Sequence, residues 1–77
     1  MKHVPVINVE KTGANLKQLR QEKYLTVKDI QKELGLAYVG GIYRWERGEI
    51  LPSIDNLIIL ANIYGVNIDD ILVIDYV

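Results

Sequence analysis

Two arginines and two tyrosines lie close together in the middle of the sequence and carry the side chains best suited to contact nucleic acid. The guanidinium groups of Arg44 and Arg47 can hydrogen-bond phosphate or the edge of a guanine base, and Tyr38 and Tyr43 can bond phosphate or stack on a sugar. Gly40 and the glycine after it stand between these residues and offer no side chain. The residue types and their spacing therefore indicate a binding surface.

Catalytic and metal-binding chemistry finds little support in the same sequence. The chain has no cysteine, and its single histidine, His3, stands near a terminus without a partner at metal-ligand spacing. Asp69 and Asp70 fall at the expected start of a helix, where the helix dipole accounts for acidic residues. No glycine-rich phosphate loop follows a strand. We therefore expect no enzyme activity, no metal, no cofactor and no small-molecule ligand.

The charge of the chain is distributed unevenly along it. The formal net charge is −1, yet all nine Lys and Arg residues lie in residues 1–47, together with five of the ten acidic residues. Residues 48–77 hold the other five acids and no base. A basic face on an acidic protein is therefore compatible with the sequence, although an ordinary solvated surface explains the charges alone equally well.

The length of the chain limits its organisation. A sequence of 77 residues has room for one domain, which we expect to span residues 1–77. A domain of this size buries only about 60% of the surface of its unfolded chain, so association with a second copy would add stability. The longest apolar run, residues 57–61, is far shorter than the roughly 20 residues that span a bilayer. We expect a cytoplasmic protein with no membrane association.

Apolar periodicity and helix-stop signals divide the chain into five helices and two extended ends. Thr12 is the expected cap of the first helix, Thr26 and Asp29 form a capping-box pattern for the second, and Ser53 and Asn67 cap the fourth and fifth. The glycines expected to end helices are Gly35, Gly48 and Gly65. The predicted helical core spans 12–72, with the second helix at about 27–34 and the third at about 39–47, between extended termini at 1–11 and 73–77.

Both ends of the chain are apolar and β-prone, at residues 4–9 and 72–77. A single strand cannot satisfy its own backbone, so the two ends are expected to pair with each other or across a dimer. Self-association as a homodimer is expected to need one or both of them.

The second and third helices, separated by a tight glycine-containing turn, have the arrangement of a helix-turn-helix. In this arrangement the first helix of the pair braces on the DNA backbone. The second lies in the major groove, where its outward side chains reach base edges.

From residue 13 to residue 72 the sequence resembles the lambda-repressor-like, Cro-type (XRE) helix-turn-helix domains. The landmarks, in chain order, are Leu16-Lys17-Gln18-Leu19-Arg20, Leu25-Thr26, Leu34-Gly35, Ile42, Trp45-Glu46-Arg47-Gly48, Pro52-Ser53 and Gly65-Val66. The resemblance implies an all-α, five-helix DNA-binding domain whose recognition helix is residues 39–47. It also implies a buried pairing of Arg20 with Glu46.

The departures from the family pattern fall where DNA would be read. The turn is one residue longer than usual, Gln31 stands where a small alanine is common, and Val27 replaces a polar residue that contacts phosphate. Tyr24 replaces the usual glycine after the first helix, so either its backbone is left-handed or the helix end shifts. Gly40 and the glycine after it stand where relatives carry polar side chains, and each costs a helix about 1 kcal/mol relative to alanine.

These observations predict a sequence-specific DNA-binding transcriptional regulator that binds a short palindromic operator as a homodimer. Arg44 is the expected base reader, because arginine suits the O6/N7 edge of guanine. The full set of expected DNA-contacting residues is Thr26, Lys28, Tyr38, Val39, Gly40, Tyr43, Arg44 and Arg47, with Arg20, Glu46 and Trp45 in structural roles. The alternative is a protein-interaction or antitoxin-like module that keeps the fold without reading DNA, which the paired glycines and the acidic second half favour.

Overall fold

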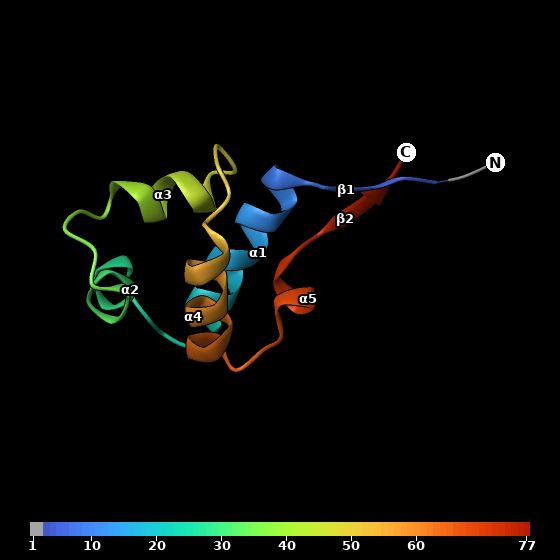
Figure 1. The fold of residues 1–77 in the computed structure, drawn as a ribbon. Coiled ribbons are helices and arrows are strands. Elements are labelled where there is room, and N and C mark those ends of the chain that lie inside the picture. Colours follow the sequence, from blue (N-terminus) through green and yellow to red (C-terminus); the bar gives the residue numbers. More distant parts are fainter. Residues whose placement is uncertain (1–2) are drawn as a thin grey trace.

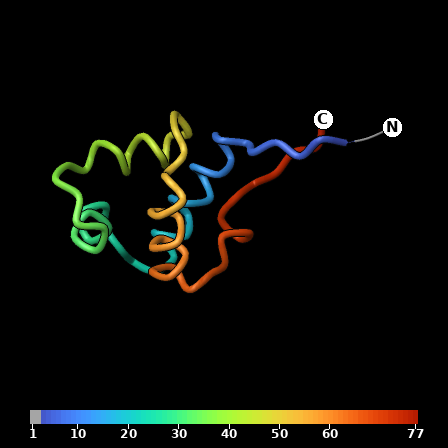
Figure 2. The backbone as a smooth tube through the Cα atoms, viewed as in Figure 1, coloured from blue at the N-terminus to red at the C-terminus, as the bar shows by residue number. Residues whose placement is uncertain are grey.

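A computed structural model describes residues 3–77 and contains, within that range, five helices and one two-stranded antiparallel ribbon (Figure 1). The elements are β1 (Pro5–Ile7), α1 (Val9–Glu22), α2 (Val27–Leu34), α3 (Gly40–Glu46), α4 (Ile54–Tyr64), α5 (Ile68–Ile71) and β2 (Ile74–Tyr76). The helices form one body and the ribbon projects from it, which accounts for the elongated extents of 45 × 22 × 20 Å (Figure 2). The expected all-α, five-helix fold with extended termini is confirmed.

The first helix begins earlier than the sequence predicts. Its N-cap is Asn8, whose side chain accepts a hydrogen bond from Lys11 N at 2.9 Å, and the helix starts at Val9. The expected cap at Thr12 is therefore wrong, because Thr12 is fully buried inside α1, where its hydroxyl accepts the N–H of Val73 at 2.9 Å. A β-branched segment that reads as a strand thus ends at Asn8, and the extended N-terminal part is shorter than residues 1–11.

The helix-turn-helix is formed by α2, a short turn and α3. Thr26 and Asp29 make the predicted capping box at the start of α2, and Gly35 ends the helix in the left-handed conformation at φ 66°. The additional turn residue is accommodated by Gln31, whose amide donates to the carbonyls of Leu36 and Ala37. The predicted third helix at 39–47 is correct to one residue at each end, because Val39 and Arg47 occupy the cap positions.

The last two helices end and begin at the expected signals. Ser53 caps α4 by accepting the N–H of Asn56, and Gly65 ends it at φ 67°. Asn67 stands at the N-cap of α5, where the carboxylate of Asp70 accepts its backbone N–H at 3.0 Å. The helix α5 packs against both α4 and α1, so this C-terminal part belongs to the same body.

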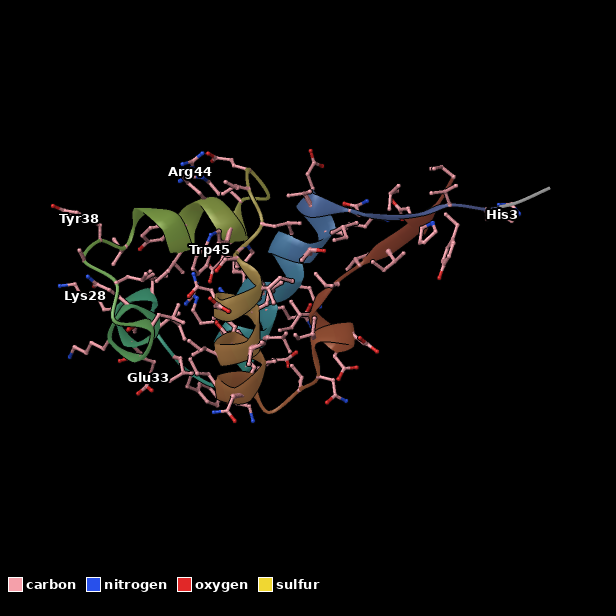
Figure 3. All side chains as sticks on the ribbon, viewed as in Figure 1. His3, Lys28, Glu33, Tyr38, Arg44 and Trp45 are labelled. Atoms are coloured by element: carbon pink, nitrogen blue, oxygen red, sulfur yellow. The ribbon has the colours of Figure 1, made fainter. Side chains whose placement is uncertain are left out.

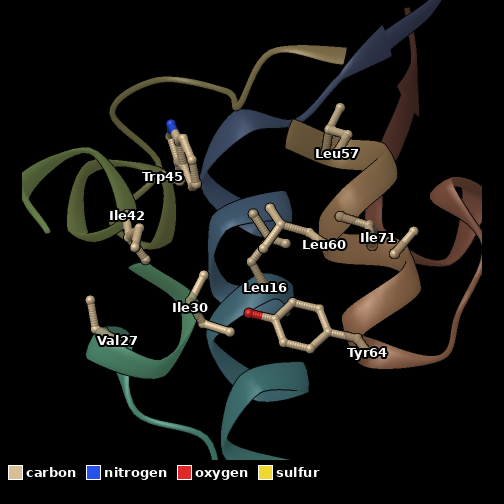
Figure 4. Close-up of a cluster of buried hydrophobic side chains, with 10 residues drawn as sticks. Leu16, Val27, Ile30, Ile42, Trp45, Leu57, Leu60, Tyr64 and Ile71 are labelled. Atoms are coloured by element: carbon tan, nitrogen blue, oxygen red, sulfur yellow. The ribbon is translucent and has the colours of Figure 1, made fainter. Parts of the chain in front are cut away.

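One apolar core joins all five helices (Figure 4). Leu16 of α1 lies at its centre, with Ile30 of α2, Ile42 of α3, Leu60 of α4 and Ile71 of α5 around it, all at most 2% exposed. Burying side chains of this size contributes about 1.5–3 kcal/mol each. The core therefore holds α2 and α3 against α1 and α4 and fixes their mutual angle.

The two ends of the chain pair with each other within the monomer. β1 and β2 are antiparallel, with Ile7 opposite Ile74, and Val4 and Val77 exchange hydrogen bonds at 2.7 and 2.9 Å. All six strand residues are exposed. The intramolecular alternative of the sequence analysis is thus confirmed, and no second chain is needed to pair these strands.

Over residues 3–77, none of the helices has the length and apolar character that a bilayer crossing requires.

Candidate nucleic-acid interface

The helix α3 has one buried side and one side facing solvent (Figure 3). Ile42 and Trp45, at 1% and 9% exposure, point into the core (Figure 4). Tyr43 is 45% exposed, and the Arg44 side chain is 55% exposed and points away from the body. Because residues three apart lie on one face of a helix, Ile42 and Trp45 both pack into the core, and Tyr43 and Arg44 lie on the free side.

The buried side of α3 is also held by an ion pair. Arg20 donates through Nε and Nη2 to the two carboxylate oxygens of Glu46, at 2.7 and 2.9 Å, and through Nη1 to the carbonyl of Leu25 at 3.0 Å. The side chains are only 12% and 6% exposed, so the pairing expected from the family resemblance is present. The hydrogen bond to Glu46 raises the pKa of Arg20 above its usual value, so this guanidinium stays charged.

A buried tyrosine of α4 lies beside this pair. Burial raises the pKa of Tyr64 to about 12, and the negative charge of Glu46 acts in the same direction. The phenol therefore stays neutral beside Glu46, and a second negative charge does not compete for Arg20.

Two glycines allow α1 to approach the end of α3 closely. A Cβ placed on Gly13 would lie 2.3 Å from the carbonyl oxygen of Trp45, and one on Gly48 would lie 2.5 Å from the Cα of Glu10. Neither distance is compatible with a side chain, so both positions require glycine. The C-terminal half of α3 is consequently fixed by backbone contact as well as by side chains.

A groove of about 380 Å³ lies between the start of α2, the third turn of α1 and the exposed side of α3. The polar side chains along it are Lys17, Thr26, Tyr43 and Arg47, and the Arg20–Glu46 pair lies in it. Two cations, two hydroxyls and the N-terminus of α2 thus converge on one hollow. This combination is suited to a phosphate group. Three of these polar residues were predicted from the sequence. Lys17, which stands one helical turn before Arg20 on α1, was not.

The first turn of α3 is bare. Gly40 and Gly41 are exposed, and a Cβ added at either would meet no atom within 4 Å. Val39, a candidate for contact with a thymine methyl, is half-buried against the core, so only part of its side chain is free. Tyr38 is 82% exposed and lies with the exposed Lys28 at the outer end of the helix pair (Figure 3).

An acidic side chain that sequence reasoning missed lies at the other end of α3. Glu49 Oε2 accepts a hydrogen bond from Arg47 Nε at 2.5 Å, and Glu49 Oε1 is 3.6 Å from Arg44 Nε. The hydrogen bond from Arg47 lowers the pKa of Glu49, so the carboxylate is ionised at neutral pH. Two of the expected DNA-contacting residues therefore already share an anion within the chain.

All eight expected contact residues belong to the helix-turn-helix or its flanks, but they do not form one patch. Thr26, Tyr43 and Arg47 line the groove, Arg44 stands beside it on the outer side of α3, and Lys28 and Tyr38 lie at the far end. Over the described residues 3–77, no group of three or more metal-ligating side chains is present. His3 is exposed, as the sequence analysis expected.

Comparison with known proteins agrees with this architecture. The pattern of the helix-turn-helix family matches residues 16–71. The chain is similar to HTH-type transcriptional regulator DdrOP3 of Deinococcus deserti, with 37% identity over 59 residues, which make up 74% of this chain and 43% of that protein. The chain thus spans less than half the length of this curated relative.

Two solved structures share the fold. The restriction-modification controller protein C.AhdI from Aeromonas hydrophila has a TM-score of 0.72 and 25% identity, with coverage of 82% of this chain and 94% of that chain. The DNA-binding domain of BldD has a TM-score of 0.71 and 22% identity, with coverage of 86% and 94%, and this likeness concerns the fold alone. With its matched residues, its five helices and the Arg20–Glu46 pair, the chain belongs to the lambda-repressor-like (XRE) helix-turn-helix family.

Proposed function

We propose that this domain is a sequence-specific regulator of transcription that binds double-stranded DNA in the cytoplasm and performs no catalysis. The observation that carries the proposal is the two-sidedness of α3, which is fixed by Ile42, Trp45 and Glu46 while Tyr43 and Arg44 remain exposed on its free side. A helix held in this way can enter the major groove without losing its packing. The name of the Deinococcus deserti relative, a transcriptional regulator, is consistent with this role.

The residues divide into one that reads bases and several that hold phosphates. Arg44 projects from the middle of α3, where its guanidinium can reach the O6/N7 edge of a guanine. The groove beside it takes a backbone phosphate, held by Lys17, Arg47 and the N–H groups at the start of α2. Lys28 and Tyr38 contact the backbone at the far end of the helix pair.

The domain binds its operator as a homodimer, through an isoleucine stripe made of Ile50, Ile54 and Ile58. These side chains are 46%, 68% and 54% exposed, and their spacing of four places Ile54 and Ile58 on one face of α4. The stripe begins in the loop that directly follows α3, so a two-fold axis there would fix how far apart the two copies of α3 lie. A palindrome with half-sites one helical turn apart requires about 34 Å.

Selection on random duplexes, followed by titration of the enriched sequence at several salt concentrations, tests the DNA-binding proposal. Enrichment of a palindromic site is the expected result. Arg44→Ala should weaken binding to that site by about 1–3 kcal/mol and leave binding to unrelated duplexes nearly unchanged. Lys17→Ala should weaken binding to all sequences alike and reduce the slope of log affinity against log salt by about one.

Sedimentation of two charge-bearing variants tests the dimer surface. Ile54→Glu should give the mass of a monomer, because it places a carboxylate in the interface. Tyr76→Glu is the matched control, since Tyr76 is 66% exposed on the ribbon, and this variant should stay dimeric. If Ile54→Glu stays dimeric and Tyr76→Glu becomes monomeric, the interface lies on the terminal ribbon instead.

A chain that enriches no sequence and binds no duplex at low salt would contradict the regulator proposal. The lack of side chains at the start of α3 would then indicate a domain that keeps the fold but no longer recognises DNA bases. The protein-interaction or antitoxin-like alternative would become the better account.

A further inference from the structure

The position of Glu49 is fixed by a chain reversal that only glycine permits. Gly48 has a φ of 72°, and a Cβ there would also collide with the backbone of Glu10. The chain therefore turns back over the end of α3, and the N–H of Glu49 donates to the carbonyl of Arg44 at 3.0 Å. This backbone hydrogen bond fixes the main chain of Glu49 next to the helix that carries Arg44.

The carboxylate of Glu49 lies next to both arginines. It bonds Arg47 Nε directly and lies 3.6 Å from Arg44 Nε, although all three side chains are roughly half exposed. Exposed ion pairs are individually weak and change an affinity by at most roughly fivefold. The contact is therefore easily broken by a competing anion and serves poorly as a structural lock.

A DNA phosphate is such a competing anion, because carboxylate and phosphate present the same oxygen pair to a guanidinium. Phosphate contacts dominate non-specific binding. On unselected DNA, each arginine must exchange one anion for another, and the remaining carboxylate repels the backbone. On a selected site, Arg44 leaves Glu49 for a base edge, which offers two directed hydrogen bonds in place of one long contact.

We propose that Glu49 is a specificity-determining residue, which holds Arg44 and Arg47 in the free domain and competes with DNA phosphates for them, so that unselected DNA binds weakly. This inference rests on the proposed DNA-binding function. In this role, Glu49 lowers the affinity for unselected DNA and so raises the ratio of the affinity for the selected site to that for unselected sites.

The test compares the affinity of Glu49→Gln with that of the unchanged domain, on the selected duplex and on an unrelated duplex. Removing the carboxylate should tighten binding to the unrelated duplex by roughly fivefold and to the selected duplex by clearly less. Glu33→Gln is the matched control for net charge, since Glu33 is exposed and lies on α2 away from Arg44 (Figure 3). This control should change both affinities equally and only slightly.

The Arg47→Ala background separates competition for arginine from general repulsion. There, Glu49→Gln should have a much smaller effect on the unrelated duplex, because one of the two competed cations is gone. An effect of Glu49→Gln equal to that of Glu33→Gln, or a loss of affinity, would overturn the proposal. Without DNA, the Nε–H signals of Arg44 and Arg47 in NMR spectra should shift in Glu49→Gln, and unchanged signals would equally overturn it.

The two proposals fail in distinguishable ways. A domain that selects a site but shows the same specificity ratio with and without Glu49 keeps its DNA-binding function and loses only this inference. A domain that binds no duplex, as unchanged protein or as Glu49→Gln, loses both.

Discussion

The neighbouring helices α2 and α3 have nearly the same length, eight and seven residues, but they are stabilised in different ways. α2 carries its own signals, with a reciprocal capping box at its start and a left-handed glycine at its end. α3 has no side-chain cap and begins with two glycines. It is held instead by Ile42, Trp45 and Glu46, all of which follow the two glycines.

The helix α2 is therefore specified by its own residues, whereas α3 is specified by contacts with neighbouring elements. Local signals act in the unfolded chain as well, whereas tertiary contacts act only once the body has formed. The first two residues of α3, Gly40 and Gly41, have neither kind of support. They are therefore the part of the pair that can adjust to a DNA surface with the smallest loss of stability.

Arg20→Ala should have the largest effect on stability, because it removes the main polar contact that holds α3. It leaves the Glu46 carboxylate buried without its partner, which should cost about 3–5 kcal/mol, a large share of the stability of a small domain. Urea denaturation measures the loss. Lys17→Ala, one helical turn earlier on α1 and exposed, should change stability by less than about 0.5 kcal/mol. Equal midpoints for the two variants would contradict the role of the pair.

Gly13→Ala should push α3 away from α1 by sterics alone. The added methyl meets three backbone atoms at 2.3–2.9 Å, and backbone cannot yield as a flexible side chain can. We expect a loss of about 3 kcal/mol in the free energy of unfolding. Ala14→Ser, at the next and exposed position, controls for substitution in this turn. A melting temperature of Gly13→Ala close to that of Ala14→Ser would show that the two helices separate at little cost.

Thr26→Ala tests the local signals of α2. It removes the acceptor for the Asp29 N–H, which lies 3.1 Å from the Thr26 hydroxyl, and should cost about 1 kcal/mol. Thr26→Ser keeps the hydroxyl, so its free energy of unfolding should stay within a few tenths of a kcal/mol of that of the unchanged domain. If thermal unfolding does not distinguish alanine from serine, α2 is held by Val27 and Ile30 alone.

Gly40→Ala should have the smallest effect and the opposite sign. The new methyl meets no atom within 4 Å, and alanine is the better helix former, so the domain should gain about 0.5 kcal/mol. Gly35→Ala is the matched control, because its surroundings are equally open but its φ of 66° penalises alanine. Calorimetry should therefore give opposite signs for the two variants, and a destabilised Gly40→Ala would mean that this turn is not helical in solution.

Features that depend only on neighbouring residues could be predicted from the sequence. The caps at Thr26 and Ser53 and the helix ends at Gly35 and Gly65 each depend on atoms within a few residues. The left-handed backbone of Tyr24, at φ 57°, was one of two alternatives for the same reason. The Arg20–Glu46 pair spans 26 positions, and only the family resemblance made it predictable.

Features that depend on distant segments were missed. Thr12 was assigned as a cap because threonine commonly caps helices, but its hydroxyl serves Val73, 61 positions away. Glu49 was overlooked because its contact with Arg44 follows from the reversal at Gly48, where a side chain would collide with the backbone of Glu10. Both depend on where α1 packs, which residue spacing does not reveal.

The pairing of β1 with β2 has a consequence for the order of events during folding. Val4 and Val77 close a loop that contains nearly the whole chain, and the entropic cost of closing a loop grows with its length. The helices depend on contacts of much shorter range, which form faster. The ribbon therefore joins a body that is already assembled, and its amide protons should be among the first to exchange with solvent while those of the core remain protected.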